Sequence, residues 1–126
     1  MKMSRLVALA VFACAATAPL HATDAPVVSG QARFTVLTPR VIRMEYSPNA
    51  QFEDAPSLVF ATRGSAPDVK ARVDHEKGWL VIRTDVLTLR YKEGSGAFTA
   101  ENLGIASKTT KPAIDWHPGL KETANL

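Results

Sequence analysis

Carboxylates are candidate catalytic side chains in this sequence, because a suitably placed pair can act as acid and base or as acid and nucleophile. Glu53 and Asp54 are adjacent, and Glu101 follows much later in the chain. Hydrolysis of a glycosidic bond uses two carboxyl groups that flank that bond. Acidic residues also occur on the loops of every soluble domain, so spacing alone gives these three residues little support as a catalytic pair.

Histidine and serine give no stronger signal. His75 and His117 are the only histidines beyond the first 22 residues, and they are 42 positions apart. This spacing does not match a metal cluster, and we expect His75 on the surface of a hairpin. Ser95 lies in Gly94-Ser95-Gly96, which does not match the G-x-S-x-G turn of a nucleophilic serine. No glycine loop of the phosphate-binding kind is found. We therefore expect neither a metal nor a cofactor.

Two tryptophans could stack on a sugar ring. Trp79 opens an expected strand just after a hairpin, which favours a place at the rim or in the core. Trp116, flanked by Asp115 and His117, is the better ligand candidate. Two roles stay open for Trp116, namely contact with a ligand and packing against a following domain, and the second is the more common role.

The N-terminus has the features of a secretory signal peptide. Lys2 and Arg5 form a basic head, the run from Leu6 to Ala18 is uncharged and mostly apolar, and Ala22 is a small residue at the boundary. The run is too short to span a bilayer, which takes about 20 apolar residues. A buried N-terminal helix would show a polar face, and this run has none. We expect residues 1–22 to be the signal, with cleavage after Ala22, and residues 23–126 to form one domain.

The only cysteine, Cys14, lies inside the signal. Val11-Phe12-Ala13-Cys14 loosely resembles the processing box of a bacterial lipoprotein, although Phe12 is larger than that box usually takes. The main expectation is therefore a periplasmic or secreted protein, and membrane attachment is expected only if Cys14 is lipidated. Cleavage after Ala22 would leave no cysteine, so no disulfide is expected even in an oxidising compartment.

The charge balance does not indicate a nucleic-acid partner. The chain has 15 Lys and Arg against 12 Asp and Glu, a formal net charge of +3. Loss of Lys2 and Arg5 with the signal leaves a single net positive charge. The remaining cations are dispersed and mostly alternate with apolar residues, whereas nucleic-acid binding needs a clustered basic face. They are best interpreted as the solvated face of a sheet.

Beyond residue 27 the sequence alternates between apolar and polar residues, as half-buried strands do. Turn residues separate the alternating runs, and no stretch shows sustained helical periodicity. This pattern predicts an all-β fold, an antiparallel β-sandwich that is incomplete. Strands are expected at about 31–37, 41–46, 69–75, 79–84 and 86–92, with a turn at 38–40 and a three-residue hairpin loop at 76–78 whose Gly78 is left-handed.

The alternation also predicts which side chains face the core. A short apolar run at 58–60 and a loop at 64–67 follow the second expected strand. Residues 108–126 show no continuing alternation, and the sequence ends without a polar cap, as expected of a truncated domain. The expected buried row is Phe34, Val36, Ile42, Met44, Tyr46, Leu80, Ile82, Leu87, Leu89, Tyr91 and Phe98.

Several segments in order resemble one known family. Residues 33–48 (RFTVLTPRVIRMEYSP) resemble the opening strands of glycoside hydrolase family 31, the α-glucosidase and α-xylosidase family. Residues 52–57, 78–84, 87–91 and 98–103 fit the same N-terminal domain in the same order. Residues 116–119 (WHPG) with Asn125-Leu126 look like the lead-in to that family's next segment. Each motif alone is weak, and the resemblance rests on their order.

The resemblance implies an N-terminal sandwich, similar to the galactose mutarotase fold, placed before a (β/α)₈ barrel. The catalytic aspartates of that family lie on the barrel, at the C-terminal ends of its strands. No catalytic residue can therefore be carried over to this chain, and the substrate-binding residues stay unassigned. The implied function is the non-catalytic N-terminal portion of an exported retaining α-glycosidase, which packs against a C-terminal catalytic domain and meets carbohydrate through that barrel.

Two other functions stay open. One is a free-standing carbohydrate-binding module in the periplasm, and the other is a lipid-anchored interaction domain if Cys14 is the processing site. The coding frame beyond Leu126 separates the first function from these two, because a barrel would have to follow directly.

Overall fold

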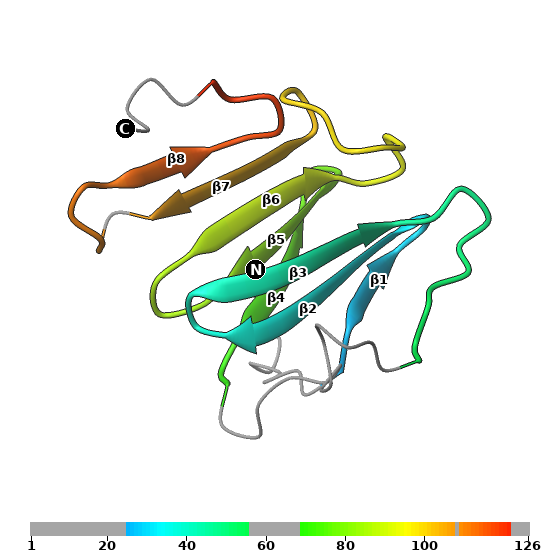
Figure 1. The fold of residues 1–126 in the computed structure, drawn as a ribbon, viewed down its shortest axis with the longest axis horizontal. Coiled ribbons are helices and arrows are strands. Elements are labelled where there is room, and N and C mark those ends of the chain that lie inside the picture. Colours follow the sequence, from blue (N-terminus) through cyan, green and yellow to red (C-terminus); the bar gives the residue numbers. More distant parts are fainter. Residues whose placement is uncertain (1–24, 56–68, 108, 122–126) are drawn as a thin grey trace, which may run out of the picture.

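The computed structural model describes residues 25–55, 69–107 and 109–121, and these residues form two antiparallel β-sheets without a helix. The predicted all-β class is confirmed. Figure 1 shows the two sheets as layers that face each other. The expected signal with Ala22 and Cys14, the apolar run at 58–60 and the loop at 64–67 all lie outside the described residues. The strands are β1 (Val27–Ser29), β2 (Ala32–Thr38), β3 (Val41–Tyr46), β4 (Arg72–Glu76), β5 (Trp79–Arg83), β6 (Thr88–Lys92), β7 (Leu103–Ser107) and β8 (Ile114–Trp116).

The smaller sheet has the order β1-β2-β3, with β2 in the centre. Phe34 of β2 lies opposite Val27 on one side and Met44 on the other. The turn expected at 38–40 is formed by Pro39 and Arg40, between strands that pair through a register shift near Thr38. Proline presets its own φ and lacks an N–H, so it suits a turn and not a central strand.

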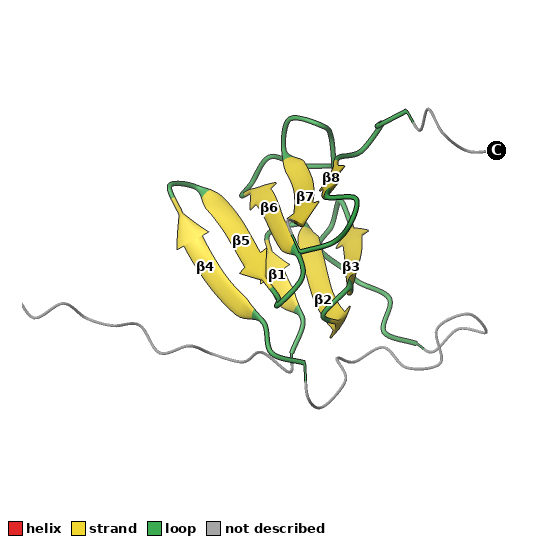
Figure 2. Ribbon diagram, turned by 90° about the vertical axis from the view of Figure 1, so that its left-hand side faces the viewer, coloured by secondary structure: helices red, strands yellow, loops and turns green. Residues whose placement is uncertain are grey.

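The larger sheet is a meander of five strands in the order β4-β5-β6-β7-β8. Each strand pairs with the next one in sequence, which Figure 2 shows from the side. The register places Val81 between Asp74 and Arg90, and Arg90 opposite Gly104. Arg90 and Gly104, which face outward, line the candidate site.

The turn between β4 and β5 is tighter than the sequence suggested. Glu76 already pairs with Trp79, so only Lys77 and Gly78 form the loop, and the three-residue loop prediction was wrong. Both loop residues have positive φ, 51° for Lys77 and 83° for Gly78. Two successive left-handed residues match the twist of a two-residue hairpin. The left-handed Gly78 was predicted correctly.

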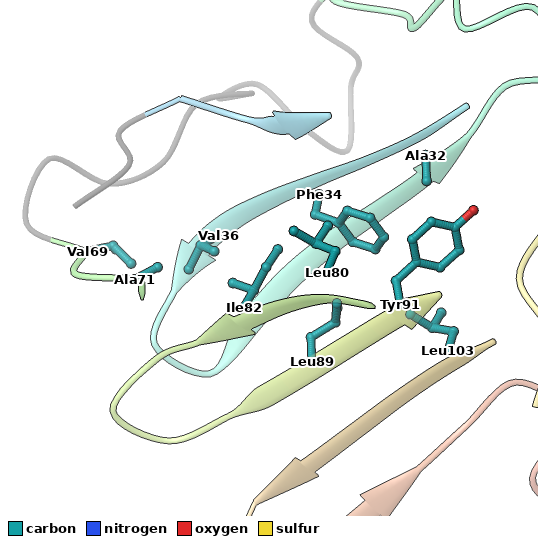
Figure 3. Close-up of a cluster of buried hydrophobic side chains, with 10 residues drawn as sticks. All are labelled: Ala32, Phe34, Val36, Val69, Ala71, Leu80, Ile82, Leu89, Tyr91 and Leu103. Carbon is teal, nitrogen blue, oxygen red and sulfur yellow. The ribbon is translucent and has the colours of Figure 1, made fainter. Parts of the chain in front are cut away.

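The core lies between β2 and the strands β5 and β6 (Figure 3). Phe34 contacts Tyr91 and Phe98, with ring centroids 5.4 and 5.8 Å apart, in the tilted geometries that aromatic rings prefer. The Tyr91 hydroxyl donates a hydrogen bond to the Gly96 carbonyl oxygen (2.8 Å), so its polar end is satisfied. The cluster consists of Ala32, Phe34, Val36, Val69, Ala71, Leu80, Ile82, Leu89, Tyr91 and Leu103.

Most of the expected buried row is confirmed, including Leu87. Ile42, Met44, Tyr46 and Phe98 were expected in the core but are only half-buried. The first three lie on β3, which is the edge of the smaller sheet and is covered less completely than the central β2. Phe98 lies outside the strands, in the connection between β6 and β7.

The C-terminal region differs from the expectation. Residues 108–126 were expected to lack strand structure, yet β8 pairs with β7 through Ile114, Asp115 and Trp116. Ile105 packs partly against the core, so the inner face of the larger sheet continues onto β7. Trp116 lies opposite Ile105 and shares that face, because directly paired residues point the same way.

The smaller sheet does not cover the inner face of the larger one completely. Leu103, at the start of β7, is buried, whereas Ile114 and Trp116 on β8 are 38% and 37% exposed. β3 is an edge strand of the smaller sheet, so no further described strand extends that sheet over β8. We call Ile114 and Trp116 the open inner face. The sandwich is incomplete there, as predicted.

Candidate functional site

The outer face of the larger sheet carries a shallow depression of ≈ 250 Å³. Gly104 has no side chain and lies opposite Arg90 on β6, so the sheet surface is low at that point. Loop residues before β7 and residues on and after β8 form the walls. The lining residues are Trp79, Arg90, Ala100, Glu101, Leu103, Gly104, Asp115, Trp116 and His117.

Trp79 and Arg90 form the side of the depression nearest β5. The guanidinium carbon of Arg90 lies 5.0 Å from the centroid of the Trp79 ring, within reach of a cation–π interaction. No described residue accepts a hydrogen bond from the Arg90 side chain or forms an ion pair with it. A second depression, of ≈ 550 Å³, lies along the same two side chains and is also lined by Glu76 and Lys77. Trp79 and Arg90 therefore border both depressions.

Acidic groups and a histidine line the opposite side. Glu101 is exposed, and a hydrogen bond from Thr99, a further one from its own backbone N–H and the nearby His117 lower the pKa of its carboxyl group. The Glu101 side chain is therefore ionised at neutral pH. Asp115 pairs with Ala106, which puts it on the outer face. His117 Nδ1 lies 3.0 Å from the Pro118 carbonyl oxygen.

Trp116 contributes its backbone to this site. Its side chain belongs to the open inner face, on the other side of the sheet from Asp115, because side chains alternate along a strand. Its carbonyl oxygen lies 3.8 Å from the position that a Cβ on Gly104 would occupy. Stacking of a ligand in this depression thus falls to Trp79, and the exposed Trp116 ring is placed for packing.

Glu53 and Asp54 lie at a different place, on the outer side of the smaller sheet. Asp54 Oδ1 accepts a hydrogen bond from Arg33 Nη1 (2.5 Å), and the Glu53 carbonyl oxygen accepts one from Arg33 Nη2 (3.2 Å). The Glu53 carboxylate accepts a hydrogen bond from the Ala55 backbone N–H (2.7 Å). The two side chains are therefore held by structural contacts, and they do not face Glu101 across a cleft.

The remaining candidates have local partners. His75 lies at the exposed end of β4, as expected, with Nδ1 2.9 Å from Glu93 Oε1. Ser29 donates a hydrogen bond to the same Glu93 oxygen (3.2 Å). The Ser95 hydroxyl donates to the Lys92 carbonyl oxygen of its own turn (2.5 Å), so its proton is engaged by the backbone.

Within residues 25–55, 69–107 and 109–121, no group of three or more His, Cys, Asp and Glu side chains is arranged to hold a metal ion. The same residues contain no helix long and apolar enough to cross a membrane.

The structure therefore brings together four residues that the sequence had singled out separately, Trp79, Glu101, Trp116 and His117. Sequence reasoning missed Arg90, Gly104 and Asp115 as site residues. Arg90 is simply the polar residue of an alternating strand, and only the register with Gly104 shows what faces it. No pattern within a single segment carries that information.

Comparisons with known proteins add no assignment. No protein-family model matches the chain, and no curated protein matches it either.

Proposed function

We propose that this chain is the non-catalytic N-terminal β-sandwich of an exported α-glycosidase, as its resemblance to glycoside hydrolase family 31 implies. In the full protein a following barrel performs retaining hydrolysis of α-linked glucosides or xylosides, and carbohydrate reaches the protein through that barrel. The observed all-β sandwich agrees with the fold that the resemblance implies.

The observation that carries the proposal is the open inner face. Ile114 and Trp116 present apolar surface to solvent, whereas the inner residues of β5 and β6 in the same sheet are buried. Contiguous exposed apolar surface marks a place where another part of a protein packs. A catalytic domain in the same polypeptide is the cover that fits this proposal.

The described residues also support a non-catalytic role. A retaining glycosidase holds two carboxyl groups about 5–5.5 Å apart across its substrate. Glu53 and Asp54 are engaged by backbone and by Arg33, and Glu101 and Asp115 line a shallow depression open to solvent. We therefore assign the chemistry to the barrel.

The experiment is to sequence the coding region beyond Leu126 and to assay both products. The protein encoded by the extended frame should hydrolyse aryl α-glucosides or α-xylosides, and the 126-residue chain should show no turnover above buffer. A frame that stops at Leu126 would contradict the proposal. So would activity of the short chain that disappears on mutation of Glu53, Asp54 or Glu101.

Export belongs to the same proposal. It is supported by the basic head at Lys2 and Arg5 and by the uncharged run beside them. N-terminal sequencing of the protein from the periplasm should begin at Thr23. A start at a modified Cys14 would instead indicate a lipoprotein, and an intact Met1 in the cytoplasm would contradict export.

The depression beside Trp79 favours a second candidate function, a free-standing carbohydrate-binding module. The first candidate requires a barrel encoded directly after the sandwich and the second does not, so the coding frame distinguishes them. Binding at the depression is compatible with both.

A further inference from the structure

We propose that the outer-face depression binds a neutral saccharide, with Trp79 and Arg90 on one side and the carboxylates of Glu101 and Asp115 on the other. This site belongs to the sandwich itself, so it does not depend on whether a catalytic barrel is present. Charge, shape and the low floor at Gly104 carry the proposal.

Charged groups of both signs face the depression. The guanidinium of Arg90 supplies N–H donors, and no described residue accepts a hydrogen bond from them. Glu101 and Asp115 supply acceptors. A hydroxyl group both donates and accepts hydrogen bonds, so one polyol can satisfy both kinds of group. An anionic ligand would meet two carboxylates of like charge. The lining therefore fits a neutral, hydroxyl-rich ligand better than an anion.

The Trp79 ring supplies the apolar part of the site. Trp79 is half-buried and lines both depressions, so the part of its ring that Arg90 leaves uncovered offers apolar area to the C–H groups of a sugar ring. Arg90 lies over this ring, which restrains the guanidinium and reduces the number of orientations it must lose on binding.

The second depression extends the site along the sheet. It shares Trp79 and Arg90 with the first and continues past Glu76 and Lys77. A ligand of more than one sugar unit can therefore contact both sides of Arg90. This geometry points to a short oligosaccharide rather than a monosaccharide.

Gly104 provides a way to fill the site without changing its charges. A Cβ at this position would meet only the Trp116 carbonyl oxygen at 3.8 Å, which is ordinary van der Waals contact. The Gly104 φ lies outside the left-handed region, and β-branched residues suit strands. Gly104→Val should therefore fold and place its methyl groups on the floor of the depression.

Saturation-transfer NMR with maltotriose on the 126-residue chain tests the proposal. We expect binding with a dissociation constant on the order of 1 mM, as befits a shallow site. Gly104→Val and Arg90→Ala should each weaken binding by at least about tenfold. Trigalacturonate, an anionic trimer, should bind more weakly than maltotriose.

The matched control is Arg72→Ala. Arg72 is an arginine on β4 whose side chain is 58% exposed, and it lines neither depression. This variant should bind maltotriose like the unmodified chain. The proposal is wrong if maltotriose does not bind, if Gly104→Val leaves binding unchanged, if Arg72→Ala weakens it as much as Arg90→Ala, or if trigalacturonate binds more tightly.

Discussion

At the scale of single residues, Arg33 is a buried cation on the outward side of β2. Its side chain is 8% exposed, and Nε and Nη2 donate to the two carboxylate oxygens of Glu45 (2.7 and 3.0 Å). Nη1 reaches Asp54, and the guanidinium carbon lies 4.7 Å from the centroid of the Phe52 ring. Hydrogen bonding to Glu45 raises the pKa of Arg33 most strongly. These contacts of Arg33 hold the segment around Phe52 against the outer side of the smaller sheet.

Arg33→Lys should lower the free energy of unfolding by about 2 kcal/mol, because an ammonium group cannot reproduce the planar fork that binds Glu45 and Asp54 together. Urea unfolding monitored by circular dichroism measures the change. Arg72→Lys is the control, since Arg72 is 58% exposed and pairs with Asp74 at the surface. That change should stay within about 0.5 kcal/mol. Equal losses in the two variants would show that the fork is unimportant.

Glu101 predicts a pH dependence at the same scale. Its pKa is below the ordinary 4.5, chiefly through the hydrogen bond from Thr99. A depressed carboxyl pKa contributes stability above the unfolded-state value, and this contribution is lost as the pH falls through the folded pKa. Thr99→Val should therefore raise the Glu101 pKa in an NMR titration. Its stability deficit relative to the unmodified chain should be present at neutral pH and smaller at acid pH. An unchanged Glu101 pKa would contradict this.

At the scale of elements, the β4–β5 turn holds Lys77 in an unfavourable backbone conformation, and a substitution can relieve it. Lys77 is a non-glycine residue at φ 51°, a conformation that asparagine adopts more readily. Lys77→Asn should raise the free energy of unfolding by about 0.5 kcal/mol, since Asn-Gly is favoured in two-residue hairpins. Gly78→Ala should lower it by about 1 kcal/mol, because alanine is strained at positive φ. Thermal unfolding of both variants measures these changes, and the opposite order would refute the turn geometry.

The elements also show how far the sequence could predict the structure. The clean alternation at 87–91 predicted a strand and its inward residues, because one face of β6 is wet. At 41–46 it predicted the strand, but both faces of β3 are half-buried. β8 was missed because three exposed residues are too few to show a period. Val81 is fully buried although it faces outward, since Asp74 and Arg90 flank it across the sheet. Neighbours on adjacent strands, including those that line the depression, depend on the strand register. They cannot be predicted from the sequence of one strand alone.

At the scale of the whole molecule, the open inner face predicts self-association of the isolated chain. Exposed apolar surface and the edge of β3, which pairs with no further described strand, both favour pairing between copies. Ile114→Lys combined with Trp116→Lys should shift the chain toward monomer in analytical ultracentrifugation. Val28→Lys is the control, since Val28 is an exposed apolar residue on β1, in the other sheet. A monomeric unmodified chain with one cooperative unfolding transition would remove the need for a covering domain.

The meander order of both sheets bears on how the protein reaches this structure. Every hydrogen-bonded pair of described strands joins neighbours in sequence, so each pairing closes only the connection between them. Loop-closure entropy is smallest for such contacts, which speeds folding. The strands β1, β2 and β3 can therefore pair with one another without any contribution from the second sheet. Contacts between the sheets, such as the packing of Phe34 against Tyr91 and the hydrogen bond from Thr84 to the Pro39 carbonyl oxygen, form once the second sheet is present.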